Sequence, residues 1–207
     1  MAVERFGFIG GHPALDFVNT LHWRLAPSRH FDALTTFDDL VTWSSRAGIL
    51  DARETATLRS DVRGVAADAV DDARGLREAI YEAAMSQDVA DALAHAFTAG
   101  LHRARLTRGN RRWAWQDVEL GPNTPADRLA RSAVELLTSE RSAAIRQCAD
   151  AECGWIYLDT SRAENRRWCS ASGCGDRNRA RDYYRRRTAA AADTSSPSTR
   201  RPGERKP

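Results

Sequence analysis

The sequence contains no apolar run long enough to cross a membrane, and its N-terminus, MAVERFGFIGGHPALDF, contains no uninterrupted apolar run of signal-peptide length. A membrane-spanning helix needs about 20 apolar residues in a row, and a signal peptide needs roughly 7–15. We therefore expect a cytoplasmic protein with no membrane partner. Thiols stay reduced in the cytoplasm, so paired cysteines there hold a metal ion more often than they form disulfides.

Motifs that mark common enzyme classes are also missing. The sequence has no nucleophile motif, no glycine-rich phosphate loop and no His–Glu metal helix, and GFIGG (7–11) is not followed by a dinucleotide fingerprint. We therefore expect no catalytic residues and no enzyme activity. The remaining histidines after His12 show no ligand pattern with carboxylates and are expected at the surface or the core edge: His22, His30, His95 and His102.

Lysine is nearly absent, with one lysine among 31 basic side chains, and alanine is abundant. A GC-rich coding sequence produces this pattern without selection for binding, so arginine content alone does not predict a nucleic-acid partner. The distribution of charge is more informative. Residues 1–147 carry 18 basic and 20 acidic side chains, whereas residues 148–207 carry 13 and 8. The basic surplus lies in the last third of the chain.

Hydrophobic spacing before residue 145 predicts a mainly helical domain. A helix is expected from about Pro13, and a Thr36–Asp39 pair like a capping box starts a second helix that Gly48 ends. Helical spacing then continues from Asp51 to about Leu106, and another helix is expected with Thr124 as its N-cap and a buried face that reaches Leu137. These segments predict a bundle of helices.

Two short segments alternate as strands do, Phe6/Phe8 and Trp113/Trp115, and we expect them to pair. The predicted fold class is therefore α+β, mainly α. A helical N-terminal domain with a small antiparallel sheet is expected over residues 1–145.

All four cysteines lie in the last third of the chain, as Cys148-x4-Cys153 and, fifteen residues later, Cys169-x4-Cys174. Two short pairs with no cysteine left over suit a tetrahedral four-cysteine zinc site, because each loop supplies two thiolates. The x4 gap is wider than the commoner x2 gap, and disulfides or unligated core thiols are the alternatives. The spacing favours one structural zinc ion per chain, held by Cys148, Cys153, Cys169 and Cys174.

The segment from 148 to about 187 is near the size at which a metal or disulfide is needed for folding. Zinc would supply about 10–16 kcal/mol of apparent binding free energy. WIYLD (155–159) predicts a strand, and Asp176 to Arg187 predicts a helix that Asp176 can cap. We predict a four-cysteine module over residues 146–187 and a disordered tail over 188–207, where no large apolar side chain occurs.

The predicted helix after Cys174 carries arginines on more than one face. Arg177, Arg181 and Arg185 are spaced by four and form one stripe. Guanidinium groups suit phosphate oxygens and guanine edges. A solvated helix whose arginines reflect codon usage is the alternative. The candidate nucleic-acid-binding residues are Arg162, Arg166, Arg167, Arg177, Arg179, Arg181, Arg185 and Arg186.

These residues resemble the CGNR zinc-finger family of stress-induced bacterial transcription regulators. The family's RRWC and CGNR motifs are similar to residues 166–169 and 174–177, and its aromatic strand to WIYLD. The preceding family domain is similar to GHPALDFVNTL (11–21), FDDLVTW (37–43) and GLREAIY (75–81). The resemblance covers about residues 5–187. It implies DNA binding by the finger and a regulatory or ligand-sensing role for residues 1–145.

One position departs from the family motif, because Asp176 stands where the family has asparagine. Aspartate keeps the capping capacity but introduces an anion that repels phosphate. If the asparagine touches nucleic acid in the family, binding is altered here; if it only caps the helix, nothing is lost.

His12, Asp16 and Asn19 lie near the start of the first predicted helix. They could converge on a small-molecule pocket, or they could cap the helix and bond to neighbouring backbone, which is the commoner role of polar side chains at helix starts.

Taken with the resemblance, the sequence predicts a DNA-binding transcription regulator with a small-molecule effector. A zinc-stabilised protein-interaction or RNA-binding module without specific DNA recognition is the alternative. Specific operators favour a homodimer, but no coiled-coil heptad is visible, so the oligomeric state stays open.

Overall fold

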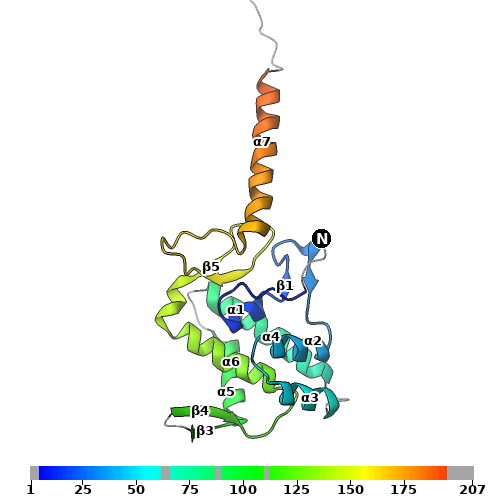
Figure 1. Cartoon of the computed structure of the whole chain (residues 1–207), viewed down its shortest axis with the longest axis vertical. Helices are drawn as coiled ribbons and strands as arrows, with labels where there is room; N and C mark the ends of the chain where they lie inside the picture. The colour runs from blue at the N-terminus through cyan, green and yellow to red at the C-terminus, as the bar shows by residue number, and fades with distance from the viewer. Residues whose placement is uncertain (1–4, 62–65, 87–89, 110–111, 195–207) are drawn as a thin grey trace, which may run out of the picture.

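The computed structural model describes residues 5–61, 66–86, 90–109 and 112–194. These residues form mainly helices, together with three antiparallel sheets of two strands each. The α+β, mainly α class predicted from the sequence is therefore confirmed. Figure 1 shows a rounded body with a β-hairpin at one end and one long helix that leaves the opposite end.

The first half of the body contains three helices, α1 (Pro13–Val18), α2 (Phe37–Arg46) and α3 (Ala52–Asp61). The capping box predicted at the start of α2 is confirmed, because Thr36 Oγ1 accepts the Asp39 N–H at 3.2 Å and Asp39 Oδ2 accepts the Thr36 N–H at 2.9 Å. Gly48 follows α2 with φ +73°, the left-handed conformation that glycine adopts at helix ends without steric cost.

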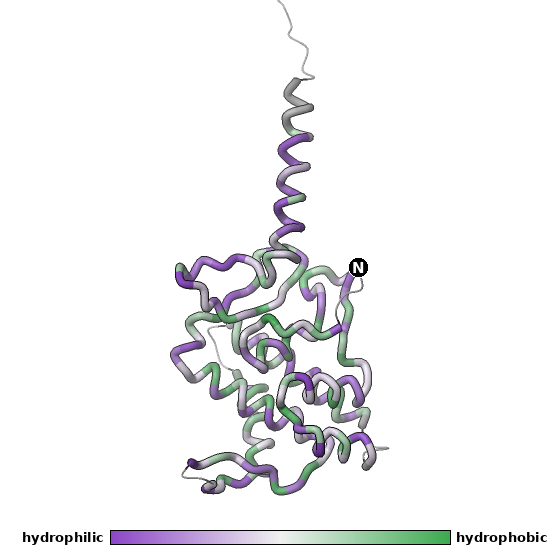
Figure 2. Tube along the Cα trace, viewed as in Figure 1, coloured by the Kyte–Doolittle hydropathy of each residue, from purple (hydrophilic) through white to green (hydrophobic). Residues whose placement is uncertain are grey.

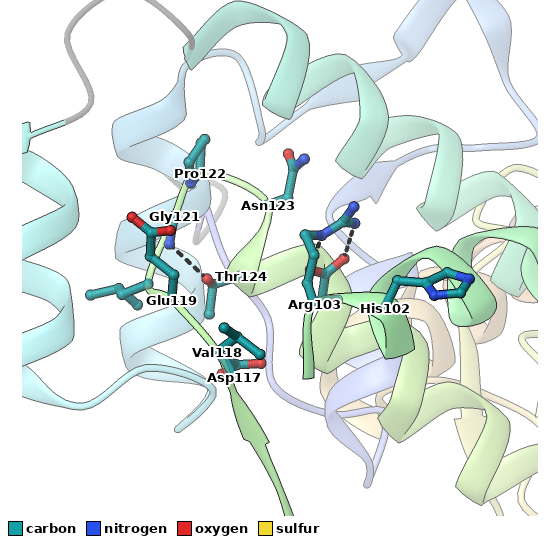
Figure 3. Close-up of a pocket in the computed structure, with 11 residues that line it drawn as sticks. His102, Arg103, Asp117, Val118, Glu119, Gly121, Pro122, Asn123 and Thr124 are labelled. Atoms are coloured by element: carbon teal, nitrogen blue, oxygen red, sulfur yellow. Dashed lines mark hydrogen bonds and ion pairs between the residues drawn. The ribbon is translucent and has the colours of Figure 1, made fainter. Parts of the chain in front are cut away.

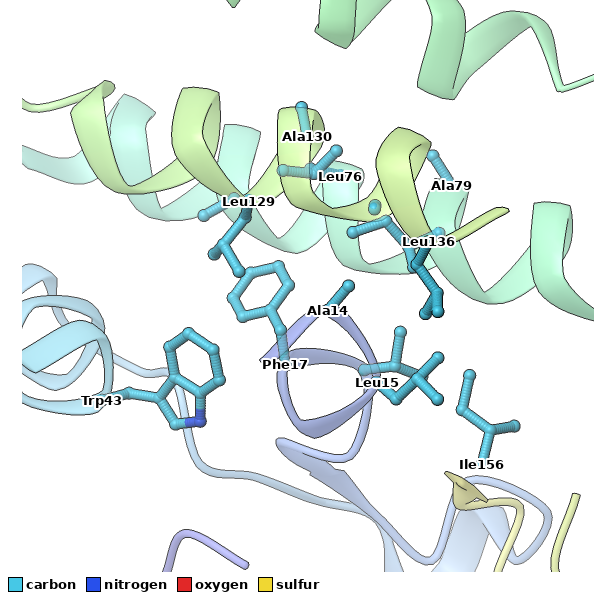
Figure 4. Packing of buried hydrophobic residues seen from close by; sticks show 14 of the residues in the cluster. Ala14, Leu15, Phe17, Trp43, Leu76, Ala79, Leu129, Ala130, Leu136 and Ile156 are labelled. Atoms are coloured by element: carbon cyan, nitrogen blue, oxygen red, sulfur yellow. The ribbon is translucent and has the colours of Figure 1, made fainter. Parts of the chain in front are cut away.

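Helix α1 lies at the centre of the core. All residues from Ala14 to Val18 are buried, so this short helix is enclosed on every side. Figure 4 shows Phe17 pointing toward Trp43 of α2 and Leu129 of α6, with Leu15 on the side of Ile156. The Phe17 and Trp43 ring centroids are 5.1 Å apart. The apolar sequence of α1 thus organises the packing of the other helices.

The second half of the body contains α4 (Ala66–Met85), α5 (Asp91–His102) and α6 (Thr124–Leu137). Buried residues Ala73, Leu76 and Ile80 of α4 and Leu129, Ala133 and Leu136 of α6 form the wall on which α1 packs. The N-cap of α6 is Asn123, one residue before the predicted Thr124.

The predicted pairing of Phe6/Phe8 with Trp113/Trp115 is wrong. β4 (Arg112–Asp117) instead pairs with β3 (Ala104–Gly109), with Leu106 opposite Trp115, and α5 ends at His102 before the predicted end of its helical segment. Phe6 is buried in the core outside any strand. The local hairpin closes a much shorter loop, so its entropy cost is lower than that of joining segments about a hundred residues apart.

Two further strand pairs join the body to the C-terminal third. β1 (Leu21–His22) pairs with β2 (Phe31–Asp32), and a 3₁₀ turn, η1 (Pro27–Arg29), lies between them. A second 3₁₀ turn, η2 (Glu140–Ala144), leads to β5 (Ile145–Gln147), which pairs with β6 (Ile156–Leu158). The strand predicted from WIYLD is thus confirmed over Ile156–Leu158.

Helix α7 (Asp176–Thr194) projects from the body, as Figure 1 shows, after one π-helical turn, η3 (Ala171–Gly175). It extends beyond the predicted end at Arg187. Residues 189–192 are alanines, the residue with the highest helix propensity, which explains the continuation. Residues 195–207 of the predicted tail lie outside the described residues.

The predicted boundary at residues 145/146 does not divide the core. Ile145, Ile156 and Leu158 belong to the same buried cluster as Leu15 and Leu136. Asn19, which is 1% exposed, clamps β6 to the end of α1: its Nδ2 donates to the Ile156 carbonyl at 2.9 Å, and its Oδ1 accepts the Ile156 N–H at 2.9 Å. The C-terminal module is therefore built onto the helical body.

We predict that Asn19→Ala lowers the free energy of unfolding by about 2–4 kcal/mol, because it leaves a buried N–H and a buried carbonyl of Ile156 without partners. Asn19→Asp should also destabilise, since a carboxylate keeps the acceptor but loses the donor. Urea unfolding measures both. Asn165→Ala, at an exposed position, is the control, and equal stabilities of the Asn19 and Asn165 variants would contradict the clamp.

Candidate metal centre and nucleic-acid interface

The four cysteines converge on one buried point. Their sulfurs all lie within 4.8 Å of one another. The Cys153 and Cys169 sulfurs are 3.7 Å apart, and those of Cys169 and Cys174 are 3.4 Å apart. Cys148 and Cys153 come from the turn between β5 and β6, and Cys169 and Cys174 come from the loop that leads to α7.

These distances fit a metal site better than a disulfide. Four sulfurs at about 2.3 Å from a central zinc ion would be about 3.8 Å from one another in a tetrahedron. Disulfide sulfurs are about 2.05 Å apart. The donor set is also appropriate, because thiolates are soft ligands that favour zinc and related ions. The four cysteines are arranged to hold a metal ion, and four protein ligands complete a tetrahedron.

Hydrogen bonds fix each cysteine loop. The Cys148 N–H donates to the Trp155 carbonyl at 2.8 Å, and the Cys153 N–H donates to the Asp150 carbonyl at 3.1 Å. The Cys169 N–H points at the Cys148 sulfur at 3.4 Å. The backbone therefore preorganises the sulfurs and places a partial positive charge beside one of them.

Gly154 is required in the first loop. Its φ is +70°, and a Cβ at this position would lie 2.8 Å from Cβ of Arg24. The Arg24 N–H also donates to the Cys153 carbonyl at 3.0 Å. The loop that carries Cys153 thus packs closely against the segment after β1.

The first turn of α7 is anchored to the first cysteine loop through Asp150, which is fully buried. Asp150 Oδ2 accepts from Arg177 Nε at 3.0 Å and from Asn178 Nδ2 at 2.6 Å. Burial raises the pKa of Asp150, but the Glu152 N–H, Asn178 and Arg177 outweigh it and hold the pKa below its usual range. The carboxylate stays ionised and fixes where α7 begins.

Two arginines of the predicted interface contact the cysteine loops. The Arg166 guanidinium lies 4.0 Å over the Tyr157 ring and donates to the Trp168 carbonyl at 3.0 Å. Arg177, besides its bond to Asp150, donates to the Cys174 sulfur at 2.9 Å. Both side chains are partly buried and hold the cysteine loops. Sequence spacing could not separate these roles from phosphate binding.

The other predicted arginines lie on exposed surface: Arg162, Arg167, Arg179, Arg181, Arg185 and Arg186. Arg181 pairs with Glu152 at 2.9 Å, and Arg185 pairs with Asp182 one turn earlier. Arg167 lies over the Trp168 ring at 5.2 Å. Figure 2 colours the turns of α7 nearest the body mainly as hydrophilic, whereas the trace of the body mixes hydrophilic and hydrophobic residues. The structure therefore displays Arg179, Arg181, Arg185 and Arg186 on a projecting helix, and Arg162 and Arg167 on the loop before Cys169.

The site prediction omitted an aromatic component of α7. Tyr183 and Tyr184 are 51% and 64% exposed, and Arg187 lies over the Tyr183 ring at 5.6 Å. Adjacent tyrosines within an arginine run were the available signal. They add flat apolar surface to the same helix.

Asp176 does not cap α7. Its side chain is exposed and pairs with Arg179. Ser170 caps the preceding turn η3, because its Oγ accepts the Gly173 N–H at 3.1 Å. The aspartate therefore reduces the exposed positive charge at the base of the helix.

His12, Asp16 and Asn19 each bond to a different backbone segment. His12 Nδ1 accepts the Ala14 N–H at 3.3 Å, which caps α1. Asp16 Oδ1 accepts the Gly10 N–H at 2.7 Å, and Asn19 clamps β6. These contacts correspond to the structural alternative left open by the sequence.

A cavity of about 620 Å³ lies between the end of α5 and the start of α6 (Figure 3). Arg103 and Asp127 face each other in it, with Nε and Oδ2 2.7 Å apart. Asp117, which also lines it, is bonded to Arg128 at 2.7 Å and to Arg131 at 2.6 Å. A charged ligand would have to break these pairs, so the cavity is a poor anion or cation site.

Aromatic residues outside the predicted site join the body to α7. Two guanidiniums lie near the Trp23 ring, that of Arg29 at 3.6 Å and that of Arg177 at 4.5 Å from its centroid. His22, expected at the surface or core edge, is buried and 5.0 Å from the Trp155 ring. Trp155 Nε1 donates to the Leu21 carbonyl at 3.1 Å. These contacts depend on loops that meet only in the folded chain.

Comparison with protein families identifies the class of protein that this fold and cysteine cluster define. Residues 144–187 match the CGNR zinc finger, which covers the cysteine cluster and all the arginines predicted to bind nucleic acid. Residues 11–140 match the ABATE family, described as "Putative stress-induced transcription regulator", and the chain belongs to that family. A search of curated proteins found no match.

Both matched families are described as a regulator or a zinc finger rather than as an enzyme. Among the described residues, no helix combines the length and apolar character needed to span a membrane.

The titration of Asp16 should make the stability of the protein depend on pH. Burial raises its pKa to about 6, although the Gly10 and Ile9 N–H groups oppose the rise. Its folded-state pKa thus exceeds the ordinary value of 3.8, so its contribution to stability is present below about pH 4 and lost as pH rises through about 6. The loss corresponds to about 3 kcal/mol. We expect Asp16→Asn to lack this decrease in urea unfolding measured from pH 4 to 7.5.

Asp68→Asn, which changes an exposed carboxyl, is the control and should keep the wild-type pH dependence. If Asp16→Asn showed the same decrease as wild type, titration of Asp16 would not be its cause.

Proposed function

We propose that the chain is a cytoplasmic DNA-binding transcription regulator whose CGNR module holds one structural zinc ion and presents α7 to duplex DNA. The observation that carries this proposal is the projection of α7 from the cysteine cluster with exposed arginines along it. A helix of 19 residues is about 28 Å long. The major groove is about 12 Å wide and admits an α-helix.

The positive charge of the α7 arginines supports an anionic partner. Most helical stability in proteins comes from packing, which the exposed residues 179–189 of α7 lack, and neighbouring like charges weaken the helix further. Phosphates would stabilise the helix by neutralising its arginines, and these contacts would supply most of the affinity. Tyr183 and Tyr184 add flat faces that could contact sugars or bases. Regulator family membership agrees with this assignment.

Zinc would be held by the sulfurs of Cys148, Cys153, Cys169 and Cys174. When bound, it would neutralise part of the thiolate charge and tie two loops together. Four protein ligands leave no open coordination position, so the role is structural rather than catalytic. Arg177 and the Cys169 N–H would compensate the remaining negative charge of the thiolates.

A protein-interaction module is the second candidate, and one observation favours it. Arg179, Arg181 and Arg185 already pair with carboxylates of this chain. Carboxylates of an acidic partner protein could replace these contacts. An RNA partner would use the same groups, and competition between RNA and DNA duplexes would show which is preferred. A homodimer would let two α7 helices read two half-sites.

Removal of the metal should unfold the C-terminal third. We expect one zinc ion per chain. Cys174→Ser or chelation should lower the melting temperature and make the segment that joins α7 to the cysteine loops accessible to protease. The reason is that apparent zinc binding supplies about 10–16 kcal/mol. Elemental analysis and limited proteolysis measure this. Ser172→Ala is a matched control on the same loop. A fully folded, metal-free wild-type protein would contradict the prediction.

DNA binding should depend on the exposed arginines of α7. We expect Arg181→Gln, Arg185→Gln and Arg186→Gln together to weaken binding to a random-sequence duplex. The log–log salt slope should fall by roughly one unit for each phosphate that the variant no longer neutralises. Fluorescence anisotropy at several salt concentrations measures both quantities.

A triple variant with the same change in net charge is the control: Arg53→Gln, Arg108→Gln and Arg141→Gln. These positions are exposed on the body and hairpin. Equal losses in both triple variants would indicate a general charge effect, and no binding by wild type at low salt would reject the DNA assignment.

A further inference from the structure

A cleft of about 230 Å³ lies between the end of β1 and the first turn of α7. It is lined by His22 and Trp23 of the N-terminal body, by Cys153 and Trp155 of the first cysteine loop, and by Gly173, Cys174 and Arg177 at the start of α7. The cleft therefore lies where the N-terminal body, the first cysteine loop and the helix that carries the exposed arginines meet.

Trp23 and Arg177, which both line the cleft, are held by different parts of the molecule. Arg24, which follows Trp23, forms an ion pair with Glu78 of α4, and its guanidinium lies 4.2 Å from the Tyr81 ring centroid. Arg177 is tied to the cysteine loops through Asp150 at 3.0 Å. The stacking of Arg177 on Trp23 thus links body and α7 across the cleft.

Trp23 is held in an unfavourable conformation. Its φ is +56°, in the left-handed region that side chains other than glycine rarely adopt. Such strain costs on the order of 1–3 kcal/mol and persists only where surrounding contacts hold it. Here the contacts are the two guanidiniums on the ring. A ligand that competes for one face would allow Trp23 to move.

The walls indicate the chemistry of the ligand. Two indoles, an imidazole and a guanidinium plane present flat surfaces, which suit an aromatic ring. Arg177 already has Asp150 and the Cys174 sulfur as partners, and the thiolates beside it disfavour an anion. An apolar cavity of about 150 Å³ holds benzene, so this larger cleft has room for two fused rings.

We propose that this cleft is an effector site for a small, uncharged, bicyclic aromatic molecule. The ligand inserts beside Trp23, displaces the Arg177 guanidinium from it and loosens α7 from the body. Its regulatory consequence rests on the proposed DNA-binding function, because the loosened helix presents its arginines less well to a duplex. The site itself does not depend on that function.

Binding is tested first without DNA. The probe is 5-fluoroindole, added to the full-length, zinc-loaded protein and followed by ¹⁹F NMR. We expect saturable line broadening for wild type and at least a tenfold weaker apparent affinity for Gly173→Leu, which fills the cleft. A Cβ at Gly173 meets only Ser170, at 3.4 Å, so the variant is expected to fold.

Two further variants make the result specific. Trp23→Leu keeps apolar volume but removes the aromatic face, and it should weaken probe binding as Gly173→Leu does. Trp115→Ala removes an exposed indole of the distant hairpin and should bind the probe as wild type does. Loss of binding in Trp115→Ala alone, or no saturable binding by wild type, would overturn the site.

The regulatory consequence is tested by DNA anisotropy with saturating 5-fluoroindole. We expect the apparent Kd for duplex DNA to rise at least threefold for wild type and to stay unchanged for Gly173→Leu. An unchanged Kd in wild type with the probe bound would overturn the coupling. If the protein bound no DNA at all, the proposed function would fail, while the NMR result would still decide whether the cleft is a ligand site.

Discussion

The convergence of four cysteine sulfurs on one buried point constrains the whole C-terminal third. These sulfurs lie within 4.8 Å of one another, and the two loops that carry them also carry the contacts that place α7. Asp150 of the first loop fixes Arg177 and Asn178 of the helix. Four thiolates this close repel one another unless a cation compensates their charge, so the proposed zinc ion would also stabilise the start of α7.

The cysteine module packs against the helical body and shares its core. Asn19 binds both polar backbone groups of Ile156, and Ile156 and Leu158 pack in the core around α1. A small module gains stability from this arrangement, because its own apolar residues are few. The arrangement also provides a physical connection between the body and α7 through Trp23, His22 and Trp155. Regulation by the N-terminal part would need such a connection, since α7 otherwise projects away from it (Figure 1).

Local patterns predicted local structure well. The capping box at Thr36, the strand at Ile156–Leu158 and the start of α7 each depend on residues within a few positions of one another. Predictions about partners distant in sequence were less successful. Phe6/Phe8 and Trp113/Trp115 both alternate as strands do, but the ring of Phe6 is needed in the core and β4 finds a partner nearby in β3. The spacing of Arg166 and Arg177 could not show that both hold the cysteine loops.

By itself the sequence determined the helical class of the body, the pairing of cysteines into two short loops and the concentration of arginines after the last cysteine. These properties follow from periodicity, spacing and charge along the chain. Tertiary structure decided which arginines remain exposed, which polar side chains near α1 clamp backbone, and where a cleft opens beside α7. Those outcomes depend on contacts between segments such as Trp23 and Arg177, which lie far apart in sequence and meet only when α1 and the cysteine loops pack together.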